Sequence, residues 1–155
     1  MTNIIGANLT FTTTDAKFGL GDRTTDSSGN EYVYVKASAA IDQYAIVTID
    51  ETYSTVVAGV STSNDARGDL LGVAPIAFAS ADYGWVQIKG PCTILVLASA
   101  TANGRLNTTA QAGYADDDAT TGSFQLEGIY LTATRTASSG SAAAILNYPI
   151  QGTVL

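Results

Sequence analysis

The fold of this chain is decided by the stretch Gly84-Trp85-Val86-Gln87-Ile88-Lys89-Gly90-Pro91 and by the apolar run 92–98 that follows it. From Val86 to Lys89 apolar and polar residues alternate, which is typical of a half-buried strand whose successive side chains point to opposite faces. Gly90-Pro91 predicts a break, because proline has no N–H to donate to a neighbouring strand. The run 92–98 is apolar on both faces, so we expect cover on both sides, from its own core and from a second layer, a terminal arm or a neighbouring subunit.

Short segments of β-forming residues recur along the whole chain and are bounded by turn residues. The link at Asp50-Glu51 is short enough to predict a hairpin. No helical periodicity extends beyond two turns, so the sequence predicts an all-β fold, a small β-barrel or β-sandwich of short antiparallel strands. We expect these strands at residues 31–38, 44–50, 53–59, 70–78, 85–89, 92–98, 124–135 and 142–148, with shorter ones around Leu106 and Tyr114.

The chain divides into an extended N-terminal arm, residues 1–30, and a single β-domain, residues 31–155. The arm is rich in Thr, Gly, Asp and Ser, and two interpretations of it stay open: a loose tail or a loop over its own core, or an arm that docks on a neighbouring subunit. Phe11 and Phe18 favour docking, because a purely solvated tail needs no large apolar side chains. The total of 155 residues suits one domain with a sizeable core.

Charged residues are scarce in this chain. They make up 14% of the sequence, against about 25% in typical domains, while 46% of the residues are hydrophobic. The surface must therefore consist largely of Thr, Ser, Asn, Gly and Ala. A surface depleted in Lys and Glu is typical of regions that contact other proteins.

The charge balance and the hydropathy pattern exclude several classes of partner. Seven Lys and Arg residues within a net charge of −7 cannot form a useful basic patch, so we expect no nucleic-acid binding. No segment approaches the ~20 apolar residues of a membrane-spanning helix. The first six residues have neither a basic region nor a long apolar stretch, so we expect no secretion signal and synthesis in a cytoplasm.

The sequence also lacks the usual components of an active site. It has no His and a single Cys, Cys92, which lies in the apolar run and is interpreted as a small core residue. Asp116, Asp117 and Asp118 could contact a hard cation, but three consecutive acids do not point at one place, and we interpret them as a solvated loop. No nucleophile elbow is present. We therefore predict no catalytic residues, no metal site, no cofactor and no enzymatic activity.

Large aromatic side chains are the candidates for contacts with other proteins. Trp85 shares its parity with Gln87 and Lys89, so it is expected on the less buried face of its strand. It is either a core residue at a barrel corner or an aromatic anchor, and exposed aromatics can also form a platform for sugars. The candidate contact residues are Phe11, Phe18, Tyr32, Tyr34 and Trp85.

The order of several short motifs resembles the small head decoration, or cement, proteins of tailed bacteriophages. These motifs are Leu70-Leu71-Gly72-Val73-Ala74, Gly84-Trp85-Val86-Gln87-Ile88-Lys89-Gly90, Ala102-Asn103-Gly104-Arg105-Leu106 with Ala112-Gly113, and Gly128-Ile129-Tyr130-Leu131 before a final apolar strand. The resemblance covers residues 30–148 and does not extend to the Thr-rich start. It implies a β-rich protein without enzymatic activity that forms oligomers, often trimers, and binds the outside of an icosahedral shell.

On this basis we expect a structural virion protein, a homotrimer on the outer surface of the capsid whose partner is the major capsid protein. The alternative is a receptor-binding or carbohydrate-binding β-module of a phage tail fibre or spike, which would need a groove of aromatic side chains with polar partners. A third possibility is a shell subunit that assembles by itself.

Overall fold

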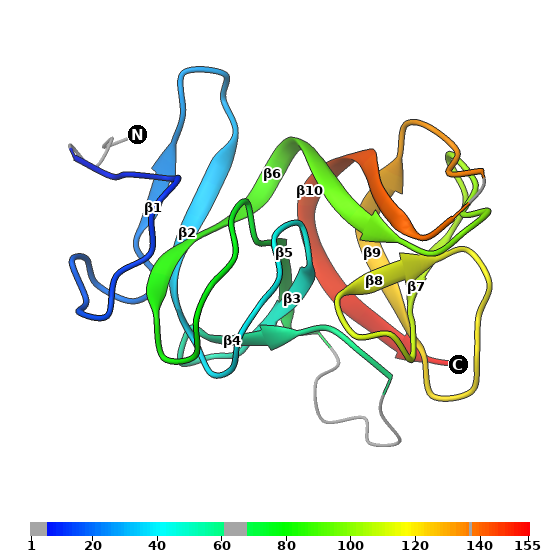
Figure 1. The fold of residues 1–155 in the computed structure, drawn as a ribbon, viewed down its shortest axis with the longest axis horizontal. Coiled ribbons are helices and arrows are strands. Elements are labelled where there is room, and N and C mark those ends of the chain that lie inside the picture. Colours follow the sequence, from blue (N-terminus) through cyan, green and yellow to red (C-terminus); the bar gives the residue numbers. More distant parts are fainter. Residues whose placement is uncertain (1–5, 61–67, 137) are drawn as a thin grey trace.

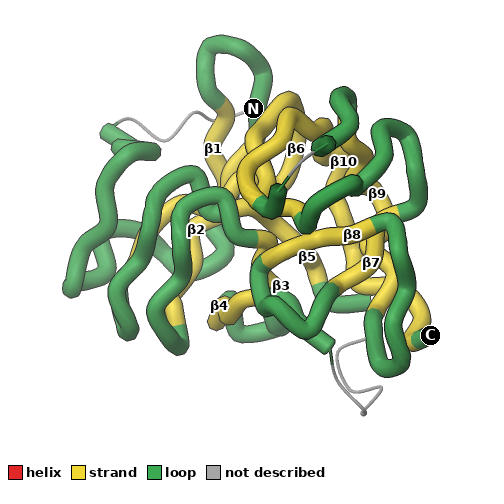
Figure 2. Tube along the Cα trace, turned by 45° about the vertical axis from the view of Figure 1, so that its right-hand side comes forward, coloured by secondary structure: helices red, strands yellow, loops and turns green. Residues whose placement is uncertain are grey.

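The computed structural model of this chain describes residues 6–60, 68–136 and 138–155, and these contain ten β-strands and no helix (Figure 1 and Figure 2). The predicted all-β class is confirmed. The strands are β1 (Arg23–Thr25), β2 (Glu31–Ala37), β3 (Ile46–Ile49), β4 (Ser54–Val57), β5 (Leu70–Val73), β6 (Tyr83–Val96), β7 (Leu106–Thr108), β8 (Tyr114–Asp116), β9 (Phe124–Leu131) and β10 (Gly140–Val154).

The strands form one mixed sheet that closes on itself twice. The first closed circuit runs β2-β4-β3-β5-β6 and returns to β2, because β6 pairs with both β5 and β2. The second runs β6-β8-β7-β9-β10 and returns to β6, because β10 pairs with both β9 and β6. Figure 1 shows the two circuits as neighbouring lobes, with β6 passing from one to the other.

The two circuits have the same topology. In the first, β2 is parallel to β4 and antiparallel to β6, while β3 is antiparallel to β4 and β5. In the second, β6 is parallel to β8 and antiparallel to β10, while β7 is antiparallel to β8 and β9. Strands β2 to β6 therefore correspond in order to β6 to β10. The chain contains a structural repeat in which β6 is the last strand of one unit and the first of the next.

Each circuit contributes to a separate hydrophobic core, and several strands lie between the two cores. Val47 of β3 is buried in the first core, whereas its neighbour Ile46 is buried in the second. On β6, Ile94 and Val96 belong to the second core, and Leu95 packs against the first. The predicted two-sided cover of the run 92–98 is thus confirmed, and within the chain it is the first circuit that supplies the second layer.

The predicted break at Gly90-Pro91 is wrong, because β6 continues through both residues. It changes partner there: β2 pairs with β6 as far as Lys89, and β10 pairs with β6 from Lys89 onward. The register between β2 and β6 shifts next to Glu31, which leaves one extra residue on β6 and produces a bulge. Gly90 accommodates the bend with a φ of +99°, a left-handed value that glycine adopts without steric cost.

Other strand boundaries also differ from the expectations. The hairpin of β3 and β4 is present. β5 ends at Val73, two residues before Pro75, and β9 ends at Leu131 rather than Arg135. β10 is longer than expected and runs to Val154 through a bulge. β1 was not expected, because Arg23-Thr24-Thr25 has no hydrophobic alternation, and it forms by pairing with β2.

Replacing Gly90 by alanine is expected to lower the free energy of unfolding by about 2–4 kcal/mol, because left-handed backbone strain adds to a collision. A Cβ at this position would overlap Oδ1 of Asn30. Gly29→Ala is the matched control: Gly29 has a φ of +84° and open space around its Cβ position, so we expect a loss of only about 1–2 kcal/mol. Urea unfolding of both variants measures the difference, and equal losses would show that Asn30 moves aside.

Three polar side chains connect the strands at the point where β6 changes partner. Lys89 Nζ lies 3.0 Å from Glu31 Oε1, and the Tyr148 hydroxyl donates a hydrogen bond of 2.7 Å to the same oxygen. The Lys89 ammonium also lies 5.3 Å from the centre of the Tyr148 ring. The hydrogen bonds from Tyr148 and Lys89 lower the pKa of Glu31 below its ordinary value of 4.5.

This network predicts a defined pH dependence. A carboxyl group whose pKa is lowered by folding stabilises the protein above its unfolded pKa, and this contribution disappears as the pH falls through the folded pKa. The hydrogen bond from Tyr148 is the largest of the effects that lower the pKa of Glu31. Tyr148→Phe removes this bond, so the pKa of Glu31 should rise. The free energy of unfolding near neutral pH should fall by about 0.5–1 kcal/mol. NMR titration of the Glu31 carboxyl and urea unfolding at pH 7 measure both effects. An unchanged pKa of Glu31 would contradict the assignment.

Candidate functional site

The described part of the N-terminal arm lies against its own β-domain, beside β2 and β6 (Figure 1). The Thr13 N–H donates to the Tyr83 carbonyl over 2.9 Å, and the Tyr83 N–H donates back over 2.8 Å. Further along, the Gly21 N–H donates to the Tyr34 carbonyl over 2.9 Å, and β1 then pairs with β2. Of the two interpretations of the arm, the loop over its own core describes the structure of this single chain.

The surface beneath the arm is aromatic because of the register between β2 and β6. Tyr34 pairs directly with Trp85, so both side chains lie on the same face of the sheet, and Tyr32 shares that face two residues away. Their ring centres are 5.0 Å apart for Tyr34 and Trp85. Phe18 of the arm completes the cluster at 5.3 Å from Tyr34 and 5.2 Å from Trp85. This aromatic cluster fixes the position of the arm.

The structure corrects the expectation that Trp85 lies on the less buried face. The face does point away from the first core, as the parity predicts, but the arm covers it, and Trp85 and Tyr34 are each only 2% exposed. Tyr32 is 7% exposed, and its hydroxyl donates to Asp26 Oδ2 over 3.2 Å. Burial, together with the Asp26 carboxylate, raises the pKa of Tyr32 to about 12.

All five candidate contact residues therefore gather in one region, but with different exposure. Phe11 is 62% exposed and accessible to a partner, and Phe18 is partly buried. Tyr32, Tyr34 and Trp85 are covered within the chain and act in this structure by holding the arm. A direct contact role at this site is available to Phe11 in the observed conformation.

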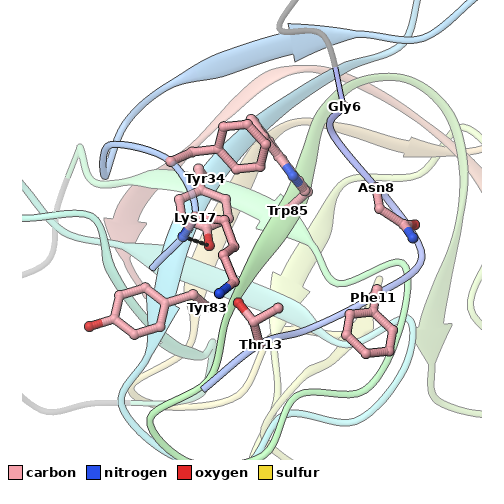
Figure 3. Close-up of a pocket in the computed structure, with 9 residues that line it drawn as sticks. Gly6, Asn8, Phe11, Thr13, Lys17, Tyr34, Tyr83 and Trp85 are labelled. Atoms are coloured by element: carbon pink, nitrogen blue, oxygen red, sulfur yellow. Dashed lines mark hydrogen bonds between the residues drawn. The ribbon is translucent and has the colours of Figure 1, made fainter. Parts of the chain in front are cut away.

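A pocket of about 130 Å³ remains between the arm and the sheet (Figure 3). The backbone N–H of Lys17 donates to the Tyr34 hydroxyl over 3.1 Å at its edge. The described residues that line this pocket are Gly6, Asn8, Phe11, Thr13, Lys17, Phe18, Tyr34, Tyr83 and Trp85.

Sequence reasoning missed five of these lining residues, and Tyr83 and Lys17 are the two with large side chains. Tyr83 stacks on Tyr34 with ring centres 6.3 Å apart, and the Lys36 ammonium lies 5.4 Å from the centre of the Tyr83 ring. Tyr83 precedes Trp85 by two residues, so the strand period places both on one face, and extending the expected strand by two residues would have found it. Lys17 carried no comparable signal, because its position depends on how the arm folds back.

The other chemical candidates have structural explanations. Burial raises the pKa of Cys92 to about 12, which keeps its thiol protonated at neutral pH. Burial also raises the pKa of Asp116, while a hydrogen bond from Thr101 lowers the pKa of Asp117, so these two neighbouring acids do not act alike. In the described part of the chain, no three His, Cys, Asp or Glu side chains are grouped so as to hold a metal ion. A helix able to cross a membrane is not found there either.

A second hollow, of about 530 Å³, lies where the β3–β4 turn approaches β5 and β10. It is lined by Asp50, Glu51 and Asp69 as well as by Arg23. Asp50 Oδ1 already accepts hydrogen bonds from the Thr52 and Ser54 backbone N–H groups, so this carboxylate shapes the turn. The aromatic pocket under the arm is the better defined site.

Comparison with known proteins identifies no relative. No protein-family model matches the chain, and no curated protein matches it significantly. The site therefore has to be interpreted from its own geometry.

The packing of the arm against the sheet should depend on Phe18 far more than on Phe11. Phe18→Ala is expected to lower the free energy of unfolding by about 1–3 kcal/mol, less than for a fully buried Phe. It should also shift the emission of Trp85, the single tryptophan, to longer wavelength as the arm loosens. Phe11→Ala is the matched control and should change stability by less than about 0.5 kcal/mol, because Phe11 is mostly exposed. Urea unfolding followed by fluorescence measures both, and equal effects would contradict the role given to Phe18.

Proposed function

We propose that this chain is a capsid decoration protein of a tailed bacteriophage. In this proposal it is made in the cytoplasm of the host bacterium, forms a homotrimer, and binds the outer surface of the assembled head. There it stabilises contacts between subunits of the major capsid protein. The resemblance in the order of its motifs and its low content of charged residues support this role, which requires neither catalysis nor a cofactor.

One structural observation carries the proposal: a row of apolar side chains crosses three strands on the outer face of the second circuit. Pro91 of β6 pairs with Ile145 of β10, and Ile145 pairs with Tyr130 of β9. Pro91 is exposed, Ile145 is partly buried, and Tyr130 is 40% exposed. Ile150, also 40% exposed, lies further along β10. An apolar row such as Pro91, Ile145 and Tyr130 on a chain with few charges is typical of a protein–protein contact.

The expected mechanism is stabilisation by mass action. A ligand that binds only the assembled shell stabilises it by RT ln(1 + [L]/Kd), about 2.7 kcal/mol at a hundredfold excess over Kd. Many equivalent sites on one head would multiply this modest contribution. A trimer would add avidity, because its second and third contacts form within one complex.

The alternative function, a receptor-binding or carbohydrate-binding module of a tail fibre or spike, is supported less well by the geometry. Such a module needs an open groove in which sugars stack on aromatic faces. Here Tyr34 and Trp85 are covered by the arm, and the pocket beside them is small. A glycan array distinguishes the two functions, since selective binding of a glycan would favour the module. Light scattering of the purified protein distinguishes small oligomers from a self-assembling shell subunit.

The contact row, that is, Pro91, Ile145 and Tyr130, can be tested on heads assembled from the major capsid protein encoded in the same genome. We expect the wild-type protein to sediment with these heads and Tyr130→Ala to bind about tenfold more weakly, as for an aromatic contact residue. Val56→Ala is the matched control, because Val56 is 42% exposed but lies on β4 of the first circuit. Wild-type protein that stays in the supernatant would refute the proposed function. Equal binding of Tyr130→Ala and Val56→Ala would refute the contact row alone.

A further inference from the structure

The pocket under the arm is bordered by a polar donor that has no partner in the described part of the chain. Trp85 is 2% exposed, and its indole N–H makes no hydrogen bond to any acceptor in the described residues. The nitrogen is not sealed in the core, and Figure 3 shows it on the side of the indole turned toward Asn8. Because the protein leaves this donor open at the wall of a pocket, a ligand that carries an acceptor can bind to it.

The other residues that line the pocket restrict the hydrogen-bonding groups and the charge of such a ligand. The Tyr34 hydroxyl accepts from the Lys17 backbone N–H, and its own proton has no acceptor among the described residues. Asn8 Oδ1 is already occupied by two hydrogen bonds from Thr10. The Trp85 indole N–H and the Tyr34 hydroxyl proton are thus donors that the described residues leave open at this pocket. Among its described lining residues, Lys17 carries the single charge, and it is positive.

The size and the walls of the pocket restrict the ligand further. Its volume is about 130 Å³, and a dry protein cavity of about 150 Å³ is known to hold one benzene ring. Phe18, Tyr34 and Trp85 pack against one another and form an aromatic wall of the pocket, against which a flat ring packs well. A sugar of similar size fits less well, because its hydroxyl groups need acceptors as well as donors.

From these observations we propose that the pocket is a binding site for a small ring-shaped carboxylate, that is, one six-membered apolar ring bearing a carboxylate group. The ring packs against the wall that Phe18 and Trp85 form together, and the carboxylate accepts the Trp85 indole N–H and faces the Lys17 ammonium. This site is independent of the proposed role on phage heads, since it concerns the isolated chain.

Benzoate is a suitable probe, and Trp85 reports on its binding because it is the single tryptophan of the chain. Titration of the full chain with benzoate should give a saturable change in Trp85 emission, excited where tyrosine does not absorb. Benzamide, which keeps the ring but lacks the charge, should bind roughly two- to fivefold more weakly, as expected for a partly exposed ion pair. Glucose should give no saturable change. Absence of a saturable response to benzoate would overturn the proposal.

Two neighbouring substitutions on the arm separate pocket binding from other effects. Thr13→Phe places a ring inside the pocket and should abolish the response, whereas Thr14→Phe should retain it, because Thr14 is exposed and does not line the pocket. Circular dichroism shows whether both variants fold. A full response of folded Thr13→Phe would overturn the site.

The charge contribution has its own test, which does not depend on filling the pocket. Lys17→Gln changes an exposed side chain and should bring the affinity for benzoate down to that for benzamide. Saturation-transfer NMR on the wild-type protein should show benzoate ring protons receiving magnetisation from the protein. If Thr13→Phe fails to fold, these two measurements decide: equal benzoate affinity of Lys17→Gln and wild type, or no transfer, would overturn the proposal.

Discussion

The structure depends on the continuity of β6. A β-strand can satisfy its backbone hydrogen bonds only with neighbours on its two edges. In its first half β6 pairs with β2 and β5, and in its second half it pairs with β10 and β8. The exchange occurs at Gly90, where the left-handed backbone bends the strand without ending it. Both closed circuits share this strand, so neither can close unless β6 is formed. The Glu31–Lys89–Tyr148 contact ties β2, β6 and β10 together at the same point.

Much of this fold could be predicted from the sequence, because hydrophobic alternation reports the local strand period. The all-β class follows from it, the β3–β4 hairpin follows from the short link at Asp50-Glu51, and the two-sided burial of residues 92–98 follows from apolar residues on both faces of that run. The path through Gly90-Pro91 could not be predicted, because the same dipeptide ends one strand and bends another, and only the long-range pairing with β10 decides between them. The double closure depends on pairings such as Val73 with Gln87, which leave no local pattern. The repeat does leave a weak trace in the sequence. At the end of the first strand of each unit the chain reads Val-x-Ala-Ser-Ala, at residues 35–39 for β2 and at residues 96–100 for β6.

For the candidate site too, the sequence predicts which side chains are aromatic and which face of the strand they lie on. It does not predict which segment covers them. Their types identified Phe18, Tyr34 and Trp85 as aromatic groups that need a partner, and the strand period placed Trp85 on the face away from the core. The partner could not be identified, because a residue on an outward face is exposed or buried according to what lies over it. Here the cover is a segment more than sixty residues away from Trp85 in the sequence, anchored by the bridge between Thr13 and Tyr83. No local pattern carries that information.

The repeat makes the two units comparable, and the arm makes them different. In the first unit, the outer face of β2 and β6 carries Tyr34 and Trp85, and the arm covers it. The corresponding strands of the second unit are β6 and β10, and their outer face carries Pro91 and Ile145 beside Tyr130 of β9. No segment in the described part of the chain lies over Tyr130 or Pro91 to the extent that the arm lies over Trp85, since both remain exposed. Equivalent faces with apolar side chains have the same physical need for cover, because exposed apolar area is unfavourable in water wherever it lies. The first unit meets this need within its own chain, so the second unit is the place where cover from another protein would gain most.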